Sequence, residues 1–331
     1  MTMETLDLAH FSDAQFDALY TQRLKPLFVE GEADRAAGVA IFKQRMAFGA
    51  SLAAVLGVAV VIGFQEFWAG VIVAAIAGVV AFTIAYMPLQ KLSDRIKNAS
   101  LDAIAKAIGV TYTEKAQPPG ALTRFRELDL LPSYDRSHFE DFFHGERQGC
   151  AFDLCEAKLE DERRDKDGDK DYVTVFRGQI IRIAFPKKFN GTTVVKRDAW
   201  VFNALRGMGE LKRVGLGDSE FEKAFEVYSD DQVEARYLVH PVFMERLIHL
   251  EEAFNGRRIR CGFQDGDLLI AVEGDDKFEI GEMFKPLADP ARAHKIVSDI
   301  AEVMKLMDAV LTAEMGPLVA RNLGGPLGDV Q

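Results

Sequence analysis

The sequence predicts an α+β protein in which a two-helix transmembrane hairpin and a helical stalk precede a domain of antiparallel strands and packing helices. Three observations predict this class. Two long apolar runs lie near the start of the chain, strand patterns are grouped after residue 120, and helical patterns separate these groups. Strands grouped with strands, with helices between the groups, are typical of α+β architecture.

Residues 46–64 and 68–89 contain no ionisable side chain, and each run is long enough to cross a hydrocarbon core of about 30 Å. Basic residues flank the pair on both sides, whereas residues 65–67 between the runs carry no positive charge. The positive-inside rule therefore predicts a multi-pass protein with the lipid bilayer as a partner and both termini in the cytoplasm. The flanking basic residues are Lys43, Arg45, Lys91, Arg95 and Lys97.

Each apolar run also carries small residues four positions apart, and such faces allow helices to approach closely. With a turn near Glu66, the two faces are expected to meet near the middle of the membrane. Their outer parts then remain available to lipid, a protein partner or another copy of the chain. The small residues are Gly49, Ala53 and Gly57 in the first run and Gly70, Ala74 and Gly78 in the second.

The chain is predicted to contain five segments, separated by changes in pattern and by glycine and proline residues. We expect a chain without residues 1–110 to fold and be soluble, because the strand and helix patterns of the core all lie beyond Gly120. In order, the segments are a cytoplasmic helical segment (1–45), the transmembrane hairpin (46–89), a stalk helix and linker (90–117), the cytoplasmic α+β domain (118–315) and a flexible tail (316–331).

Composition and charge narrow the range of functions. The chain has 331 residues, 48% of them hydrophobic, and a net charge of -11. An acidic chain argues against nucleic acid as a partner. The three cysteines, Cys150, Cys155 and Cys261, lack CxxC spacing, which suits a reducing compartment and suggests no zinc site.

Two short turns are predicted within the domain, Asn190-Gly191 and Asp265-Gly266, each between strand patterns. The first turn would place basic residues along one ribbon, with a phenylalanine near its tip. We predict that this ribbon contacts the membrane or a protein partner; the alternative is that its lysines solvate an exposed sheet edge. The residues concerned are Lys187, Lys188, Phe189, Lys196 and Arg197.

Two stretches of the domain, FRGQIIRIAFPKKFNGTTVV (176–195) and FEKAFEVYSDDQVEARYLVHPVFMERL (221–247), resemble the bacterial family catalogued as domain of unknown function 3137. The resemblance runs from about residue 120 to about residue 310. Members of this family are often anchored by a pair of transmembrane helices, which implies a bacterial inner membrane for this protein. The family has no established catalytic residues, so the resemblance assigns none.

The remaining motifs give no catalytic residue, no metal site and no cofactor. The acidic run 165–171 resembles a calcium loop but lacks its glycine and its final glutamate. His138 and His144 do not have a recognised metal-ligand spacing. Lys212 and Arg213 lie between glycine pairs and could bind phosphate, although a simple turn explains the same pattern.

We therefore predict a membrane-tethered cytoplasmic binding or scaffolding module that is a subunit of a membrane-associated assembly. The sequence favours binding over catalysis because no set of nucleophile, base and orienting group is evident. Two alternatives stay open. One is a membrane-surface enzyme that uses the region from His138 to His144, and the other is a lipid or small-ligand sensing domain, which requires an apolar cavity.

Overall fold

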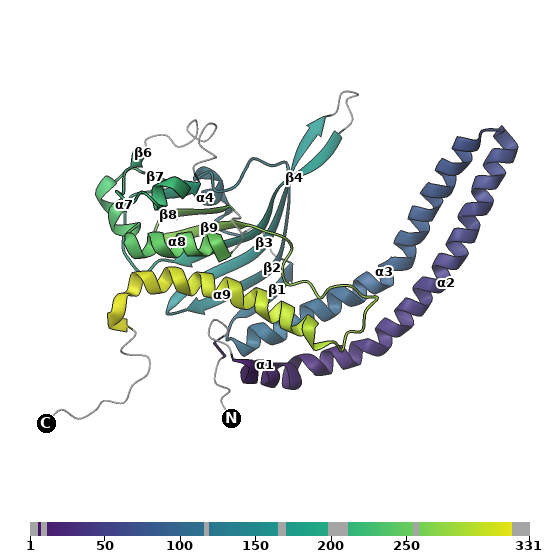
Figure 1. Ribbon diagram of the computed structural model, residues 1–331, viewed down its shortest axis with the longest axis horizontal. Coiled ribbons are helices and arrows are strands. Elements are labelled where there is room, and N and C mark those ends of the chain that lie inside the picture. The colour runs from purple at the N-terminus through teal and green to yellow at the C-terminus, as the bar shows by residue number, and fades with distance from the viewer. Residues whose placement is uncertain are drawn as a thin grey trace. The chain divides into compact units, whose positions relative to one another are not determined.

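The computed structural model describes residues 6–7, 12–115, 119–164, 170–197, 211–253 and 258–319. The chain divides into two compact units (Figure 1). We call them the sheet unit (1–10, 105–277 and 299–331) and the anchor unit (11–104 and 278–298). An α+β architecture of long N-terminal helices followed by an antiparallel sheet with helices confirms the predicted fold class.

The anchor unit is built on two long helical stretches. Ser12 and Gln15 form a capping box at the start of the first stretch, which then continues without a break to Phe64. Gln65 adopts a left-handed conformation, with φ of 56°, and ends this stretch. The predicted stalk is confirmed, since the second helix continues through Pro88. The elements are α1 (Asp13–Leu19), the π-helical turn η2 (Tyr20–Leu24), α2 (Lys25–Phe64) and α3 (Phe67–Ala107).

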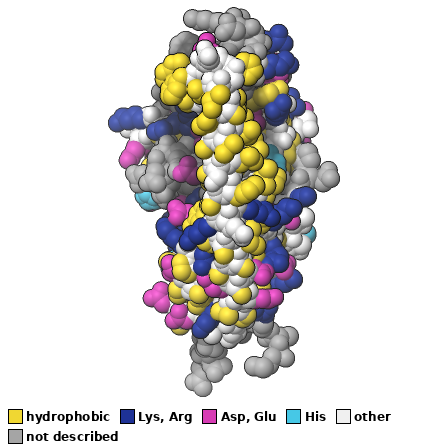
Figure 2. Space-filling view, turned by 90° about the vertical axis from the view of Figure 1, so that its right-hand side faces the viewer, with side chains coloured by type: hydrophobic (Ala, Val, Ile, Leu, Met, Phe, Trp, Pro, Cys, Tyr) yellow, Lys and Arg dark blue, Asp and Glu magenta, His cyan; other side chains and the backbone are white. Residues whose placement is uncertain are grey.

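Both α2 and α3 are long and apolar enough to cross a membrane. Only 11% and 6% of their most apolar stretches are buried, so neither is the covered core helix of a soluble fold. Figure 2 shows hydrophobic side chains running along the hairpin in an almost continuous band. The largest of them include Phe48, Val55, Ile62, Phe64, Trp68 and Val79, each more than half exposed.

The two helices of the hairpin pack through small residues. A Cβ atom on Gly57 would lie 2.8 Å from the carbonyl oxygen of Gly70 and 2.9 Å from Cβ of Ala74. A Cβ atom on Gly49 would likewise lie 2.4 Å from Cβ of Ala81. The predicted meeting of the small faces is therefore confirmed for Gly57 and Ala74, whereas Gly49 and Ala81 meet in a part of the helices that was expected to remain free. It is wrong for Gly78, where a Cβ atom would meet nothing within 4 Å.

The part of the hairpin farthest from Gln65, which we call the anchor base, is completed by residues 278–298. The Glu32 carboxylate accepts a hydrogen bond from the backbone N–H of Leu287 at 2.7 Å. Lys97 and Glu279 form an ion pair at 2.7 Å. Apolar side chains fill the space between these contacts. The fully buried ones include Phe28, Leu89, Leu101, Ile104, Phe278, Ile280 and Leu287.

The sheet unit contains, within the described residues, one antiparallel sheet of nine strands in the order β1-β2-β3-β4-β9-β8-β5-β7-β6. The strands are β1 (Thr111–Lys115), β2 (Arg136–Arg147), β3 (Cys150–Arg164), β4 (Lys170–Ala184), β5 (Thr193–Arg197), β6 (Lys212–Val214), β7 (Phe225–Ser229), β8 (Ile259–Gln264) and β9 (Asp267–Glu273). The helices are α4 (Leu122–Glu127), α6 (Phe221–Ala224), α7 (Gln232–Leu238), α8 (Pro241–Ala253) and α9 (Pro290–Val319). β1 lies inside the segment 90–117 that was expected to be stalk and linker.

Both faces of the sheet are covered. On one face, α4 and the residues after it pack Phe125 and Leu130 against a cluster that includes Cys155, Phe176 and Leu269. On the other face, Phe243 of α8 contacts Phe263 of β8 with ring centroids 5.6 Å apart. The part of α9 that belongs to the sheet unit contributes further buried side chains. These are Ile300, Ala301, Val303, Met304, Leu306, Met307, Val310 and Leu311.

The two predicted turns have different outcomes. Asp265 and Gly266 both have positive φ, 53° and 78°, and connect β8 to β9 as predicted. The prediction of a hairpin at Asn190-Gly191 is wrong, because β5 pairs with β7 and β8 and not with the residues that precede the turn. The turn residues instead donate their backbone N–H groups to the Glu234 carboxylate, at 2.9 Å from Asn190 and 2.6 Å from Gly191.

Candidate functional site

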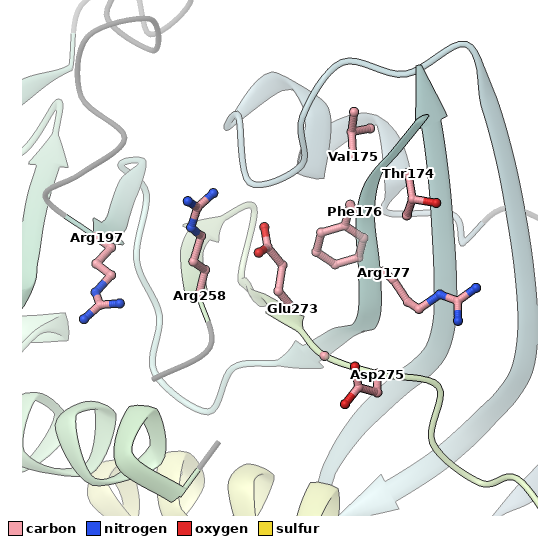
Figure 3. Close-up of a pocket in the computed structure, with 9 residues that line it drawn as sticks. Thr174, Val175, Phe176, Arg177, Arg197, Arg258, Glu273 and Asp275 are labelled. Atoms are coloured by element: carbon pink, nitrogen blue, oxygen red, sulfur yellow. The ribbon is translucent and has the colours of Figure 1, made fainter. Parts of the chain in front are cut away.

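A pocket of about 600 Å³ opens in the sheet unit where β4 extends past the end of β9 (Figure 3). β9 pairs with β4 only from Gly178 onward, so the preceding residues of β4 have no strand beside them on that side within the described part of the chain. The end of β5 and the start of β8 form the opposite wall. The pocket is lined by Thr174, Val175, Phe176, Arg177, Arg197, Arg258, Glu273, Gly274 and Asp275.

Three arginines from separate parts of the chain lie around this pocket. Figure 3 shows Arg258 beside Glu273, with Arg197 on one side of this pair and Arg177 on the other. The three guanidinium groups are spread around the opening and do not converge on one point. Such an arrangement suits an extended acidic segment better than a single small anion, because each guanidinium can bind a different carboxylate.

Glu273, one of the two acids that line the pocket, already has an internal partner. Glu273 accepts a hydrogen bond from Arg260, which is 2% exposed and also donates to the carbonyl oxygen of Leu130 at 2.9 Å. Burial lowers the pKa of Arg260, and the nearby Glu273 opposes this change. Arg177 forms an ion pair with Asp276 at 3.3 Å. The pocket therefore presents fixed charges of both signs, with arginine at three places on its rim.

The residues predicted to form a basic ribbon are dispersed. Lys187 lies over the ring of Tyr237, 4.5 Å from its centroid, and Lys188 is exposed. Phe189 is buried against Phe185 and Phe263. Lys196 is also buried, and its ammonium donates to Asp129 at 2.9 Å. Arg197 alone of the five lines the arginine-rich pocket.

The loop that was predicted to bind phosphate already uses two of its backbone N–H groups to bind a carboxylate of the same chain. The backbone N–H groups of Leu216 and Gly217 donate to the carboxylate of Glu222, at 2.8 and 3.1 Å. These hydrogen bonds lower the pKa of Glu222. Arg213 is paired with Glu226 at 3.2 Å, and Lys212 is exposed on β6. The glycines at 207 and 209 lie outside the described residues.

The histidines of β2 do not form a catalytic group with each other. His138 is exposed and lies 4.0 Å from Glu140, whereas His144 pairs in register with Thr111 and Asp153. The cysteines are all buried. Burial raises the pKa of Cys261 to about 12 and also raises that of Cys155, so neither thiol is activated as a nucleophile. Residues 165–169 of the acidic run lie outside the described residues.

Sequence reasoning missed a cluster of acids on the sheet. One carboxylate oxygen each from Glu140, Glu156 and Asp276 lie within 4.8 Å of one another. Glu156 is 4% exposed, and burial raises its pKa to about 9. The three acids are distant from each other in the sequence, and they come together only through strand pairing and the segment after β9. No local spacing could have indicated them.

The fold and the pocket define a class: an α+β protein with two helices able to cross a membrane and an arginine-lined pocket in its sheet unit. Residues 174–311 match the family model described as "Protein of unknown function (DUF3137)". This match confirms the family resemblance predicted from the sequence, although it begins later than residue 120.

Two other comparisons add little. No curated protein matches this chain. Among solved structures, the crystal structure of the mycobacterial trehalose monomycolate transport factor A, TtfA, is similar, with a TM-score of 0.32 and 10% sequence identity. That comparison covers 64% of this chain and 94% of the other. A likeness of this size assigns neither a fold nor a function.

Proposed function

We propose that this protein is a membrane-anchored binding module that faces the cytoplasm and holds an acidic segment of a protein partner in its arginine-lined pocket. The observation that carries the proposal is the placement of Arg177, Arg197 and Arg258 around one opening of the sheet unit. The exposed apolar surface of α2 and α3 supports the anchor. Basic residues on both flanks of the hairpin support cytoplasmic termini.

Binding fits the geometry of the site better than catalysis does. Arginine remains protonated at physiological pH, so it can hold a carboxylate but is a poor general base. The charged lining also favours a protein segment over a lipid tail, which needs an apolar cavity. The apolar groove that the structure shows, about 860 Å³, instead lies along the hairpin between residues such as Phe48, Leu52 and Ile84.

The proposal can be tested with the full chain purified in a mild non-ionic detergent. A fluorescein-labelled oligoglutamate peptide serves as the acidic probe, and fluorescence anisotropy at low salt reports its binding. Each lost charge-assisted contact costs about 1.5 kcal/mol or more. The double variant Arg197→Gln/Arg258→Gln is therefore expected to bind the probe about tenfold or more weakly than the wild type.

A matched control removes the same charge elsewhere on the sheet unit. Arg236 and Arg246 are exposed on α7 and α8, outside the pocket lining. The variant Arg236→Gln/Arg246→Gln is expected to bind like the wild type. Equal affinity of the wild type and the pocket variant, or equal losses in both double variants, would show that the pocket is not the binding site.

A further inference from the structure

A row of polar side chains crosses three neighbouring strands of the sheet. Glu140 of β2 lies directly opposite Glu156 of β3, which in turn lies opposite Gln179 of β4. Residues in register on antiparallel strands point to the same face. A β-bulge follows Glu140, where Asp141 has φ of 52°, and bulges of this kind redirect side chains. Asp276, just after β9, completes the group.

Two oxygen atoms in this row lack a hydrogen-bond partner among the described residues. Oε1 of Glu156 accepts from Nε2 of Gln179 at 2.8 Å and from the backbone N–H of Lys277 at 3.0 Å. Oε2 of Glu156 and Oε1 of Gln179 are buried without any donor. Glu156 and Gln179 are 4% and 1% exposed. Buried acceptors are costly when they are left without a donor or a cation.

The charges around Glu156 are mostly negative. Asp141 accepts a hydrogen bond from the hydroxyl of Tyr112 at 2.7 Å, and both lie close to the row. The ammonium of Lys277 is directed to Glu302 of α9, at 2.6 Å. It also lies 4.0 Å from Asp299. Arg177 provides one positive charge next to Asp276.

We propose that Glu140, Glu156 and Asp276 bind a hard divalent cation, for which Ca²⁺ is the best match. Carboxylate and amide oxygens are the ligands that such cations prefer. The three oxygens lie within 4.8 Å of one another, so a point exists within about 2.8 Å of all three, close to Ca²⁺–oxygen distances of about 2.3 to 2.6 Å. Glu140 and Asp276 are not fully buried, so water can complete the coordination.

Such an ion would hold together parts of the chain that are distant in sequence. It would link β2 and β3 to residue 276, and the chain enters the anchor unit at residue 278. None of the three carboxylates is among the pocket residues, but Asp276 is paired with Arg177 of the pocket at 3.3 Å. The two proposals are tested separately, because the pocket variant changes Arg197 and Arg258 whereas the cation variants change Glu140 and Glu156.

Calorimetric titration of CaCl₂ into the full chain in detergent, after treatment with EDTA and buffer exchange, tests the proposal. We expect saturable binding of one Ca²⁺ per chain. The variants Glu156→Gln and Glu140→Gln are each expected to weaken binding by about tenfold or more, since each loses a charged ligand. Glu160→Gln is the matched control, because Glu160 lies on the same strand and pairs with Lys158 at 2.5 Å.

The competing explanation is that a proton alone satisfies the buried carboxylate. In that case neither CaCl₂ nor MgCl₂ gives a saturable signal, and neither salt changes the thermal unfolding midpoint of the wild type. That result, or unchanged Ca²⁺ affinity in folded Glu156→Gln and Glu140→Gln, overturns the proposal. Circular dichroism of each variant establishes that it is folded, and Glu140→Gln provides the test if Glu156→Gln does not fold.

Discussion

At the scale of residues, the sheet unit contains a buried lysine whose charge is paired with a carboxylate. Lys196 is 3% exposed, and it shares one face of β5 with Val194, which is fully buried. Its ammonium is paired with Asp129, whose side chain is one-third exposed. Burial lowers the pKa of Lys196, and the Asp129 carboxylate opposes this change. Lys196 is therefore a buried charge that needs the Asp129 carboxylate beside it.

We predict that substitutions of the two members of this pair change the free energy of unfolding by different amounts. Asp129→Asn leaves a buried ammonium without its counter-ion and should lower the free energy of unfolding by about 3 kcal/mol at neutral pH. Lys196→Met leaves a carboxylate that water can reach, so the change should stay within about 1 kcal/mol. Thermal unfolding in detergent measures both. Lys188→Met, at an exposed lysine, should have no effect.

The pH dependence of Asp129→Asn follows from the lowered pKa of Lys196. Between this lowered pKa and the unfolded value of about 10.4, the unfolded state binds more protons than the folded state. Stability therefore rises with pH in that window. The loss in Asp129→Asn should be largest below the folded pKa and smaller near pH 10 or so. A loss that does not change with pH would contradict this interpretation.

At the scale of elements, local patterns predicted helices and turns better than strand partners. The apolar runs and their small residues correctly indicated α2, α3 and much of their contact. The turn at Asp265-Gly266 was predicted correctly because the residues of a two-residue turn are recognisable from the local sequence. Asn190-Gly191 carries the same signal, but Val194 and Val195 are fully buried between β7 and β8. Burial in the sheet interior determined the partners of β5.

The candidate site could not be predicted for the same reason. Arg177, Arg197 and Arg258 belong to three strands or strand ends that are separated in sequence and are brought together by the order β4-β9-β8-β5. Arg197 was identified from the sequence, but it was expected on a ribbon that does not form. Phe189 was assigned to a ribbon tip, although its ring packs in the core.

The glycines of the hairpin give a prediction at this scale. Gly57→Leu should force α2 away from α3, because the carbonyl oxygen of Gly70 leaves no space for a side chain. Overpacking of this kind costs about 1 to 3 kcal/mol, so the unfolding midpoint in detergent should fall. Gly63→Leu is the control on the same helix, since a Cβ atom there meets nothing within 4 Å. Equal midpoints for the two variants would contradict the packing described.

At the scale of the whole molecule, the chain passes between the two units more than once. Residues 278–298 leave the sheet unit after β9, join the anchor base and then return along α9. From the sequence, a fragment lacking residues 1–110 was expected to fold and stay soluble, because the strand and helix patterns of the core lie beyond Gly120. We propose the opposite outcome, because residues 278–298 belong to the anchor unit. Phe278, Ile280 and Leu287 are buried within the anchor unit.

Removing residues 1–104 should therefore expose these side chains and give an aggregated product. A variant in which a short Gly-Ser linker replaces residues 47–83 keeps the anchor base, because Arg45 lies near the carbonyl oxygen of Ile84, at 3.4 Å. We expect this variant to be soluble and released from membranes. Size-exclusion chromatography and membrane fractionation measure both outcomes. A soluble, monomeric fragment lacking 1–104 would show that the anchor base is dispensable.

Residues 278–298 belong to the anchor unit but are translated after most of the sheet unit, so the anchor unit is completed late in synthesis. The hairpin leaves the ribosome early, and it can enter the bilayer while most of the sheet unit has not been made. Leu287, which lies with Ile96 next to Gly31, is translated much later. A chain that stops before residue 278 would leave this apolar surface of the hairpin without the cover that Leu287 provides. Quality-control proteases would be able to recognise such an incomplete chain.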